Sequence, residues 1–68
     1  MNFPIYTIYK HPVDYPDKFV CRMFDMGVPT HVMATADTLA EIRSMLPEGL
    51  LNLGRDPADD PCVVEVWL

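Results

Sequence analysis

The stretch TADTLAEIRSMLPEG, residues 35–49, decides the fold, because its apolar residues follow the period of a helix while those around it alternate as in strands. The apolar stripe of this helix, expected over 35–46, consists of Leu39, Ile42, Met45 and Leu46. A helix of about three turns is too short to be stable alone, so we expect it to pack on a sheet.

Residues that favour the start and the end of a helix flank this segment. Asp37 or Thr38 can serve as the N-cap, and Thr38 with Glu41 matches a capping box, in which the glutamate returns to the backbone N–H of the cap residue. At the other end Pro47 cannot continue the hydrogen-bond ladder, and Gly49 suits a left-handed residue.

Segments with strand-like alternation lie on both sides of the helix. They cover residues 3–9, 18–25 and 30–34 before it and 62–68 after it, and the short apolar stretch 50–53 is a further candidate. A loop over 11–17 and a turn over 27–29 separate the first three. The order β-β-β-α-(β)-β predicts a single α+β domain over 1–68, with an antiparallel sheet of four to five strands and one helix packed across one face.

One helix covers one face of a sheet, so the opposite face is expected to expose apolar side chains. We expect Tyr6, Ile8, Val63 and Trp67 on that face. Large exposed apolar patches mark interaction sites, and Trp and Tyr are favoured there as anchors. The expected occupant is a second copy of the chain or another protein.

Composition excludes several classes of protein. With 68 residues, half of them hydrophobic, the chain is too short for a two-domain enzyme and too apolar for a disordered acidic tail. The 5 basic residues against 10 acidic ones, a net charge of −5, argue against direct nucleic-acid binding. No apolar run reaches the roughly 18 residues of a membrane helix. The N-terminus lacks a secretory signal pattern, which favours the cytoplasm and reduced thiols.

Residues that could carry chemistry are sparse. His11, His31, Cys21 and Cys62 show no metal-ligand spacing, and the two cysteines with His31 fall short of a nucleophilic triad. The pair Asp59-Asp60 lies in a proline-flanked loop over 55–61, where carboxylates are normally solvated rather than catalytic. We therefore expect no enzyme activity, no metal and no cofactor.

The acidic side chains form the candidate binding set, because residues 44–68 hold five of them against Arg55 alone. A negative surface attracts basic protein surfaces. The candidate partner-binding residues are Asp14, Asp17, Glu48, Asp56, Asp59, Asp60, Glu65 and Trp67. Two alternatives stay open: the acids form a solvated surface that keeps the protein soluble, and Trp67 belongs to the core rather than to an interface.

Two stretches carry a resemblance to known proteins. Residues 46–50, Arg55 and 60–68 form the first, and residues 14–22 form the second; together they cover about half of the chain. They resemble small uncharacterised proteins of phages and mobile elements of the anti-CRISPR type. The resemblance implies a non-catalytic inhibitor that binds a nuclease or surveillance complex and blocks its nucleic-acid groove. It assigns no role to any single residue.

The sequence thus favours a small acidic, non-enzymatic protein-binding module. Its expected partner is a protein with a basic nucleic-acid-binding surface, in a host defence complex that a phage-type inhibitor would block. The alternative is a small cytoplasmic homodimer with a structural or adaptor role, whose exposed sheet faces or edges pair.

Overall fold

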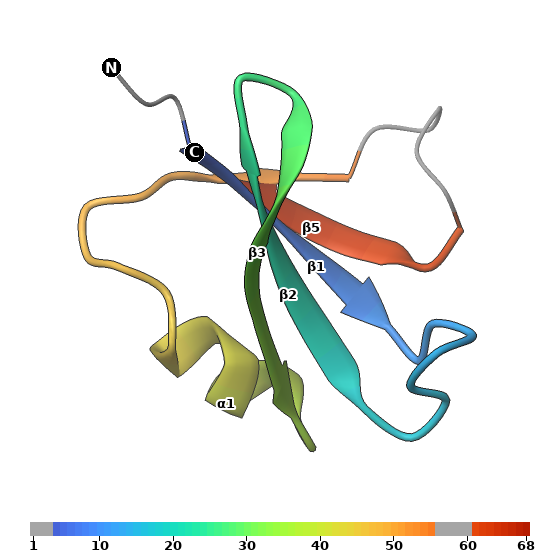
Figure 1. Ribbon diagram of the computed structural model, residues 1–68. Helices are drawn as coiled ribbons and strands as arrows, with labels where there is room; N and C mark the ends of the chain where they lie inside the picture. Colours follow the sequence, from blue (N-terminus) through green and yellow to red (C-terminus); the bar gives the residue numbers. More distant parts are fainter. Residues whose placement is uncertain (1–3, 56–60) are drawn as a thin grey trace.

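An antiparallel sheet of five strands with a short helix on one face makes up the part of the chain that the computed structural model describes, residues 4–55 and 61–68 (Figure 1). Its elements are β1 (Pro4–Lys10), β2 (Phe19–Asp25), β3 (Val28–Ala36), α1 (Leu39–Ser44), β4 (Asn52–Gly54) and β5 (Val63–Trp67). The strands lie in the order β3-β2-β1-β5-β4. The predicted α+β fold is confirmed.

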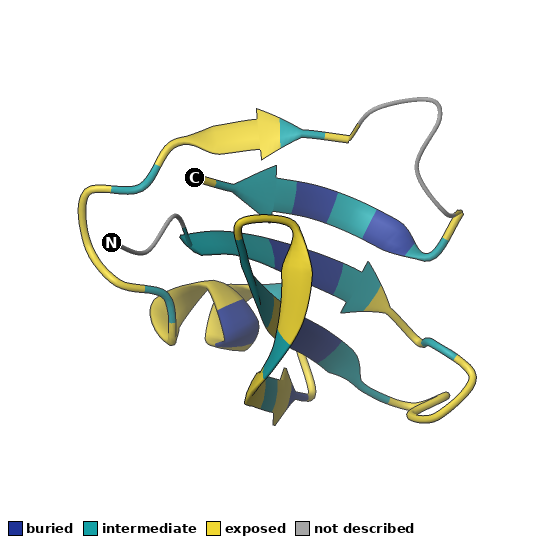
Figure 2. Ribbon diagram, turned by 45° about the horizontal axis from the view of Figure 1, so that its top comes forward, coloured by how far each residue is buried: buried dark blue, intermediate teal, exposed yellow. Residues whose placement is uncertain are grey.

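The core lies between α1 and the sheet. Ile8 and Cys21 are paired neighbours on β1 and β2, and Ala36 of β3 and Ile42 of α1 complete the buried cluster. Partly buried apolar residues surround it, namely Tyr6, Phe19, Ala34, Leu39, Leu46, Val64 and Trp67. Figure 2 shows this arrangement as dark bands along the central strands and on the inner side of the helix.

The helix is shorter than predicted. It covers Leu39–Ser44 instead of 35–46, because β3 continues to Ala36, which still pairs with Phe19. Thr38 then has an extended backbone, with φ −129° and ψ 158°, and acts as the N-cap. The predicted three turns are therefore fewer than two. The shorter helix depends even more on its contact with the sheet.

The β2–β3 hairpin also differs from the prediction. Its turn consists of Met26 and Gly27, both with positive φ, at 53° and 82°. Asp25 pairs directly with Val28, so β3 begins two residues before the predicted start of the strand. Pro29 lies inside β3, which is tolerated because β3 is an edge strand.

The prediction of which residues face away from the helix is wrong for three of its four members. Tyr6, Ile8 and Trp67 lie on the helix side and pack on or within the core cluster. The alternation within β1 was read correctly, but the side of the sheet that α1 covers could not be read from the strand, and the predicted alternation of β5 does not hold throughout. Only Val63 lies on the open face.

A β-bulge explains why Val63 does not share a face with Trp67, as the alternation of β5 predicted. Ile8 pairs with Glu65, whereas Tyr9 pairs with Val63, so Val64 is an extra residue in β5. A bulge turns neighbouring side chains out of strict alternation. Val64 therefore joins the helix-side cluster while Val63 turns to the open face.

Candidate protein-binding surface

The loop between β1 and β2, residues 11–18, is held by its own backbone hydrogen bonds. The His11 N–H donates to the Lys18 carbonyl at 2.9 Å, which closes the base of the loop. Inside it, the Tyr15 N–H donates to the Pro12 carbonyl at 2.9 Å and the Lys18 N–H donates to the Tyr15 carbonyl at 3.1 Å. These successive turns fix the backbone that carries the two predicted aspartates.

This loop exposes both apolar and acidic side chains. Val13 is 94% exposed, and Asp14, Tyr15 and Asp17 are exposed as well. Tyr15 thus lies between two carboxylates in sequence, and neither aspartate takes part in the ion pairs Lys18–Asp37 and Arg43–Glu65. Sequence reasoning found the acids but not their apolar neighbours, although the letters VDYPD contain both.

The Lys18–Asp37 ion pair ties the end of the loop to the chain just after β3. The hydrogen bond from Lys18 to Asp37, together with their opposite charges, raises the pKa of the lysine. Lys18 is therefore neutralised by a partner outside the loop. Asp14 and Asp17 are not part of this ion pair.

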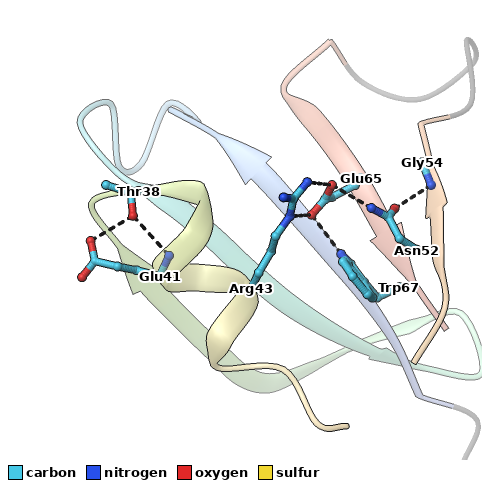
Figure 3. Close-up of polar contacts among 7 residues, drawn as sticks. All are labelled: Thr38, Glu41, Arg43, Asn52, Gly54, Glu65 and Trp67. Atoms are coloured by element: carbon cyan, nitrogen blue, oxygen red, sulfur yellow. Dashed lines mark hydrogen bonds and ion pairs between the residues drawn. The ribbon is translucent and has the colours of Figure 1, made fainter. Parts of the chain in front are cut away.

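Glu65 on β5 is the centre of a polar network that joins three elements (Figure 3). The Arg43 guanidinium of α1 donates to both carboxylate oxygens, with Nε–Oε1 at 2.6 Å and Nη2–Oε2 at 2.7 Å. The Asn52 amide of β4 donates to Oε2 at 3.0 Å, and the Trp67 indole donates to Oε1 at 3.0 Å. Each carboxylate oxygen therefore accepts two hydrogen bonds.

The electrostatics of this network follow from its donors. The hydrogen bonds from Arg43, and then those from Trp67 and Asn52, lower the pKa of Glu65 against the opposing effect of burial. The same contact raises the pKa of Arg43. Glu65 is only 4% exposed, so its charge is used inside the fold. This position does not suit the predicted docking role, and we leave Glu65 out of the binding surface.

Sequence reasoning missed Arg43 and Asn52 as partners of Glu65. The available signal was a single acidic residue inside the apolar strand VVEVW, because a buried carboxylate needs a donor from elsewhere. Nothing in the spacing of the sequence identifies that donor.

Trp67 is half-buried and pairs with Tyr6 across β1 and β5. Its ring packs against the helix-side core, and its N–H is bonded to Glu65. Of the two interpretations left open for Trp67, this place corresponds to the core rather than to a free anchor.

The remaining acidic candidates are not gathered with Asp14 and Asp17. Glu48 is exposed in the connection between α1 and β4, and Figures 1 and 2 place this connection on the side of the molecule opposite the loop 11–18. Asp56, Asp59 and Asp60 lie outside the described residues. The docking set that the structure brings together therefore consists of Asp14 and Asp17 with Val13 and Tyr15.

The residues considered for catalysis and metal binding are dispersed. Cys21 and Cys62 form no disulfide, and burial raises the pKa of the Cys21 thiol to about 11, so it stays protonated at neutral pH. His11 packs edge-on against Phe19, with 5.5 Å between ring centres. Within residues 4–55 and 61–68 no cluster of three or more His, Cys, Asp or Glu side chains could hold a metal ion.

The open face of the sheet carries a shallow groove of about 410 Å³. It runs between β1, β5 and the β2–β3 turn and is lined by Ile5, Thr7, Tyr9, Phe24, Gly27, Val63 and Val66. The prediction that the face without a helix is largely apolar agrees with this lining, although most of its members differ from those expected.

In the described part of the chain, α1 is far too short to cross a membrane, and no other helix is long and apolar enough to do so. Comparison with known proteins finds no family model, no curated protein and no solved structure that matches this chain.

Proposed function

We propose that the protein is a non-enzymatic protein-binding module that docks on a basic surface through the loop 11–18. One observation carries this proposal: a loop fixed by three backbone hydrogen bonds presents two exposed carboxylates beside the exposed Val13 and Tyr15. The acidic sequence around 56–60 and the net charge of −5 add to the attraction for a basic partner.

The loop combines the two contributions that such docking needs. Carboxylates speed the encounter with Lys and Arg and set the orientation of the complex. Tyr15 and Val13 supply apolar contact area, and Tyr is enriched among the residues that dominate binding energy. Because the turns of the loop are already formed, little conformational entropy is lost on binding.

The proposed partner is the nucleic-acid-binding surface of a host defence complex, and the protein acts there as a phage-type inhibitor of the anti-CRISPR kind. A groove built for nucleic acid is lined with basic side chains, and Asp14 and Asp17 can occupy positions that phosphates otherwise take. The resemblance of residues 14–22 to such proteins supports this assignment.

The test is displacement of fluorescently labelled DNA from purified bacterial CRISPR nuclease complexes. The wild-type protein should displace the DNA, and displacement should weaken as salt rises, because exposed charges are screened over about 10 Å at 0.1 M. The double variant Asp14→Lys/Asp17→Lys should lose about tenfold or more in affinity. Tyr15→Ala should lose affinity without changing the salt dependence.

Glu48→Lys is the matched control for the single variant Asp14→Lys, because each reverses one exposed charge and Glu48 lies on the other side of the molecule. Equal losses for the loop variant and the control would show that net charge, and not the loop, drives binding. Failure of the wild type to displace DNA from every complex would sink the inhibitor assignment.

The homodimer remains the alternative function. It involves a different surface from the loop 11–18, and the specific observation that favours it is the uncharged edge strand β3.

A further inference from the structure

β3 forms one edge of the sheet and is the longest strand, with nine residues. It is bonded to β2 alone, so the backbone N–H and C=O groups on its other side face outward. Such an edge is a template for a further strand unless charge, proline or a bulge protects it. The question is which parts of β3 carry that protection.

Protection is confined to the first half of β3. Pro29 lies near its start, and the pairing with β2 is irregular between Arg22 and Phe24, where β3 holds two extra residues. From Met33 to Ala36 the register is regular, with each residue opposite its partner on β2. The second half of the strand is therefore a straight, unprotected edge.

Charge decides what can occupy this edge. The strand VPTHVMATA has no Asp, Glu, Lys or Arg, whereas β1, β2 and β5 each carry at least one. A chain with net charge −5 repels its own copy at any acidic surface, and like charges directly opposite each other destabilise a strand pair. A symmetric pair of β3 strands places no like charges opposite each other, because the strand has no Asp, Glu, Lys or Arg. The occupant that fits β3 is a second copy of this chain.

Geometry then selects the register. In a two-fold antiparallel pair that continues the sheet, one residue faces its own copy across the axis, because opposite residues must share a face. With Ala34 on the axis, Val32 faces Ala36 and Met33 faces Thr35 of the second copy. Moving the axis to Thr35 would place Met33 opposite Asp37. An axis at Met33 would also avoid charge, but it would place Ala36 opposite Thr30, in the irregular half of the strand. The Ala34 register is thus the one that keeps the pairing within residues 32–36 and free of charge.

The helix side of this edge is shaped for such a neighbour. A small groove of about 80 Å³ lies here, lined by Tyr6, Cys21, Met23, Val32, Met33, Ala34, Met45 and Leu46. Val32 and Met45 are each 54% exposed. A second strand beside β3 would cover both side chains, and the small Ala34 lets the two backbones approach.

We propose that two copies of this chain form a symmetric dimer in which the segments 32–36 of β3 pair antiparallel about Ala34. The sheet continues across the two-fold axis, and both helices lie on the same side of it. This dimer does not depend on the docking function of the loop 11–18, and either can hold without the other.

Mass in solution is the first test. Sedimentation equilibrium of the full chain should give twice 7.8 kDa, with dissociation on dilution. Thr35→Lys places a charge in the paired segment and should weaken the dimer about tenfold or more. Leu53→Lys, at the other edge of the sheet, is the matched control and should leave the dimer intact. Circular dichroism confirms that both variants stay folded.

Cross-linking tests the register. In a Cys21→Ala/Cys62→Ser background, which removes the thiol directly opposite Ala34 on β2, Ala34→Cys should oxidise to a covalent dimer at least about tenfold faster than Leu53→Cys, because pairing holds the two thiols together. A wild-type protein that stays monomeric at all concentrations would overturn the proposal. A dimer that survives Thr35→Lys and does not cross-link through Ala34→Cys would place the interface elsewhere and overturn it equally. Normal dimerisation of Asp14→Lys/Asp17→Lys separates this result from the docking test.

Discussion

Replacing Glu65 by Gln tests whether the buried carboxylate holds the sheet and the helix together. The substitution keeps the shape of the side chain but leaves one acceptor oxygen and introduces one NH2 group. Glu65 accepts four hydrogen bonds, two of them from Arg43. The new NH2 group would then occupy the place of one carboxylate oxygen and face the N–H donors that this oxygen accepts from. The Asn52 amide cannot turn over to compensate, since its oxygen accepts the Gly54 N–H at 2.8 Å.

The expected cost follows from the bonds that are lost. A hydrogen bond to a charged group contributes about 1.5–3 kcal/mol, and the half-exposed Arg43 can recover part of its share from water. We therefore expect Glu65→Gln to lower the free energy of unfolding by about 2 kcal/mol. For a domain of this size, that corresponds to a melting temperature lower by about 10 °C.

The dependence of the unfolding free energy on pH gives a second, independent test of this role of Glu65. Because the pKa of Glu65 is lowered in the folded state, its contribution is complete above the unfolded value near 4.5 and is lost as the pH falls through the folded value. The difference in unfolding free energy between wild type and Glu65→Gln should therefore be largest near neutral pH. It should shrink in acid as the wild-type carboxylate becomes protonated.

Urea denaturation followed by far-ultraviolet circular dichroism, at neutral and acidic pH, measures both effects. Glu48→Gln is the matched control, because it removes the same charge from an exposed side chain and should change stability by less than about 0.5 kcal/mol. The reasoning is refuted if Glu65→Gln is as stable as Glu48→Gln at neutral pH, or if the difference from wild type persists unchanged in acid.

Three further outcomes are expected. Thr38→Ala should cost about 1 kcal/mol by removing the acceptor of the Glu41 N–H, measured by urea denaturation; an unchanged midpoint would show that the cap contributes nothing. Met26→Asn should stabilise the protein by about 0.5 kcal/mol, because Asn adopts positive φ more readily, and a lower melting temperature would contradict a left-handed residue there. Iodoacetamide should label half-buried Cys62 well before Cys21, whose thiol pKa is raised to about 11; equal labelling by mass spectrometry would place Cys21 at the surface.

Local signals in the sequence predicted local structure well. The capping box of Thr38 and Glu41 is present, with the Glu41 N–H donating to the Thr38 hydroxyl oxygen at 3.1 Å. The Glu41 carboxylate, however, accepts from the Thr38 hydroxyl at 3.1 Å rather than from the backbone N–H of Thr38 as predicted. The position of the cap followed from residue types. Its detailed geometry depends on where β3 ends, which sheet pairing decides.

The sequence-based predictions were wrong where the structure of a segment depends on the strand with which it pairs. Thr35 and Ala36 have acceptable helix propensity, but their pairing with Val20 and Phe19 keeps them in β3. Tyr6 and Trp67 were assigned to the wrong face because alternation does not say which face the helix covers. Strand boundaries, the bulge at Val64 and the side of the sheet all depend on contacts between distant segments, which a single sequence does not reveal.

The candidate site shows the same limit. Charge and residue type identified Asp14 and Asp17, which are exposed as expected, but they also selected Glu65, which is buried. The two kinds of acid differ in their neighbours in space and not in their residue type. Arg43 is 22 residues from Glu65 in the chain, so only the fold brings the pair together.

The burial of Glu65 has a physical reason in the shortness of the elements around it. An apolar residue in place of a buried ion pair is often as stable, so the charge alone does not explain its position. α1 has six residues and buries only Ile42, and β4 has three residues. Neither has enough apolar surface to fix its place on the sheet. Directional bonds from Arg43 and Asn52 to one carboxylate attach both elements to β5. The acid of the most apolar strand is thereby used to complete a thin core, and the carboxylates left for a partner are those of the loop 11–18.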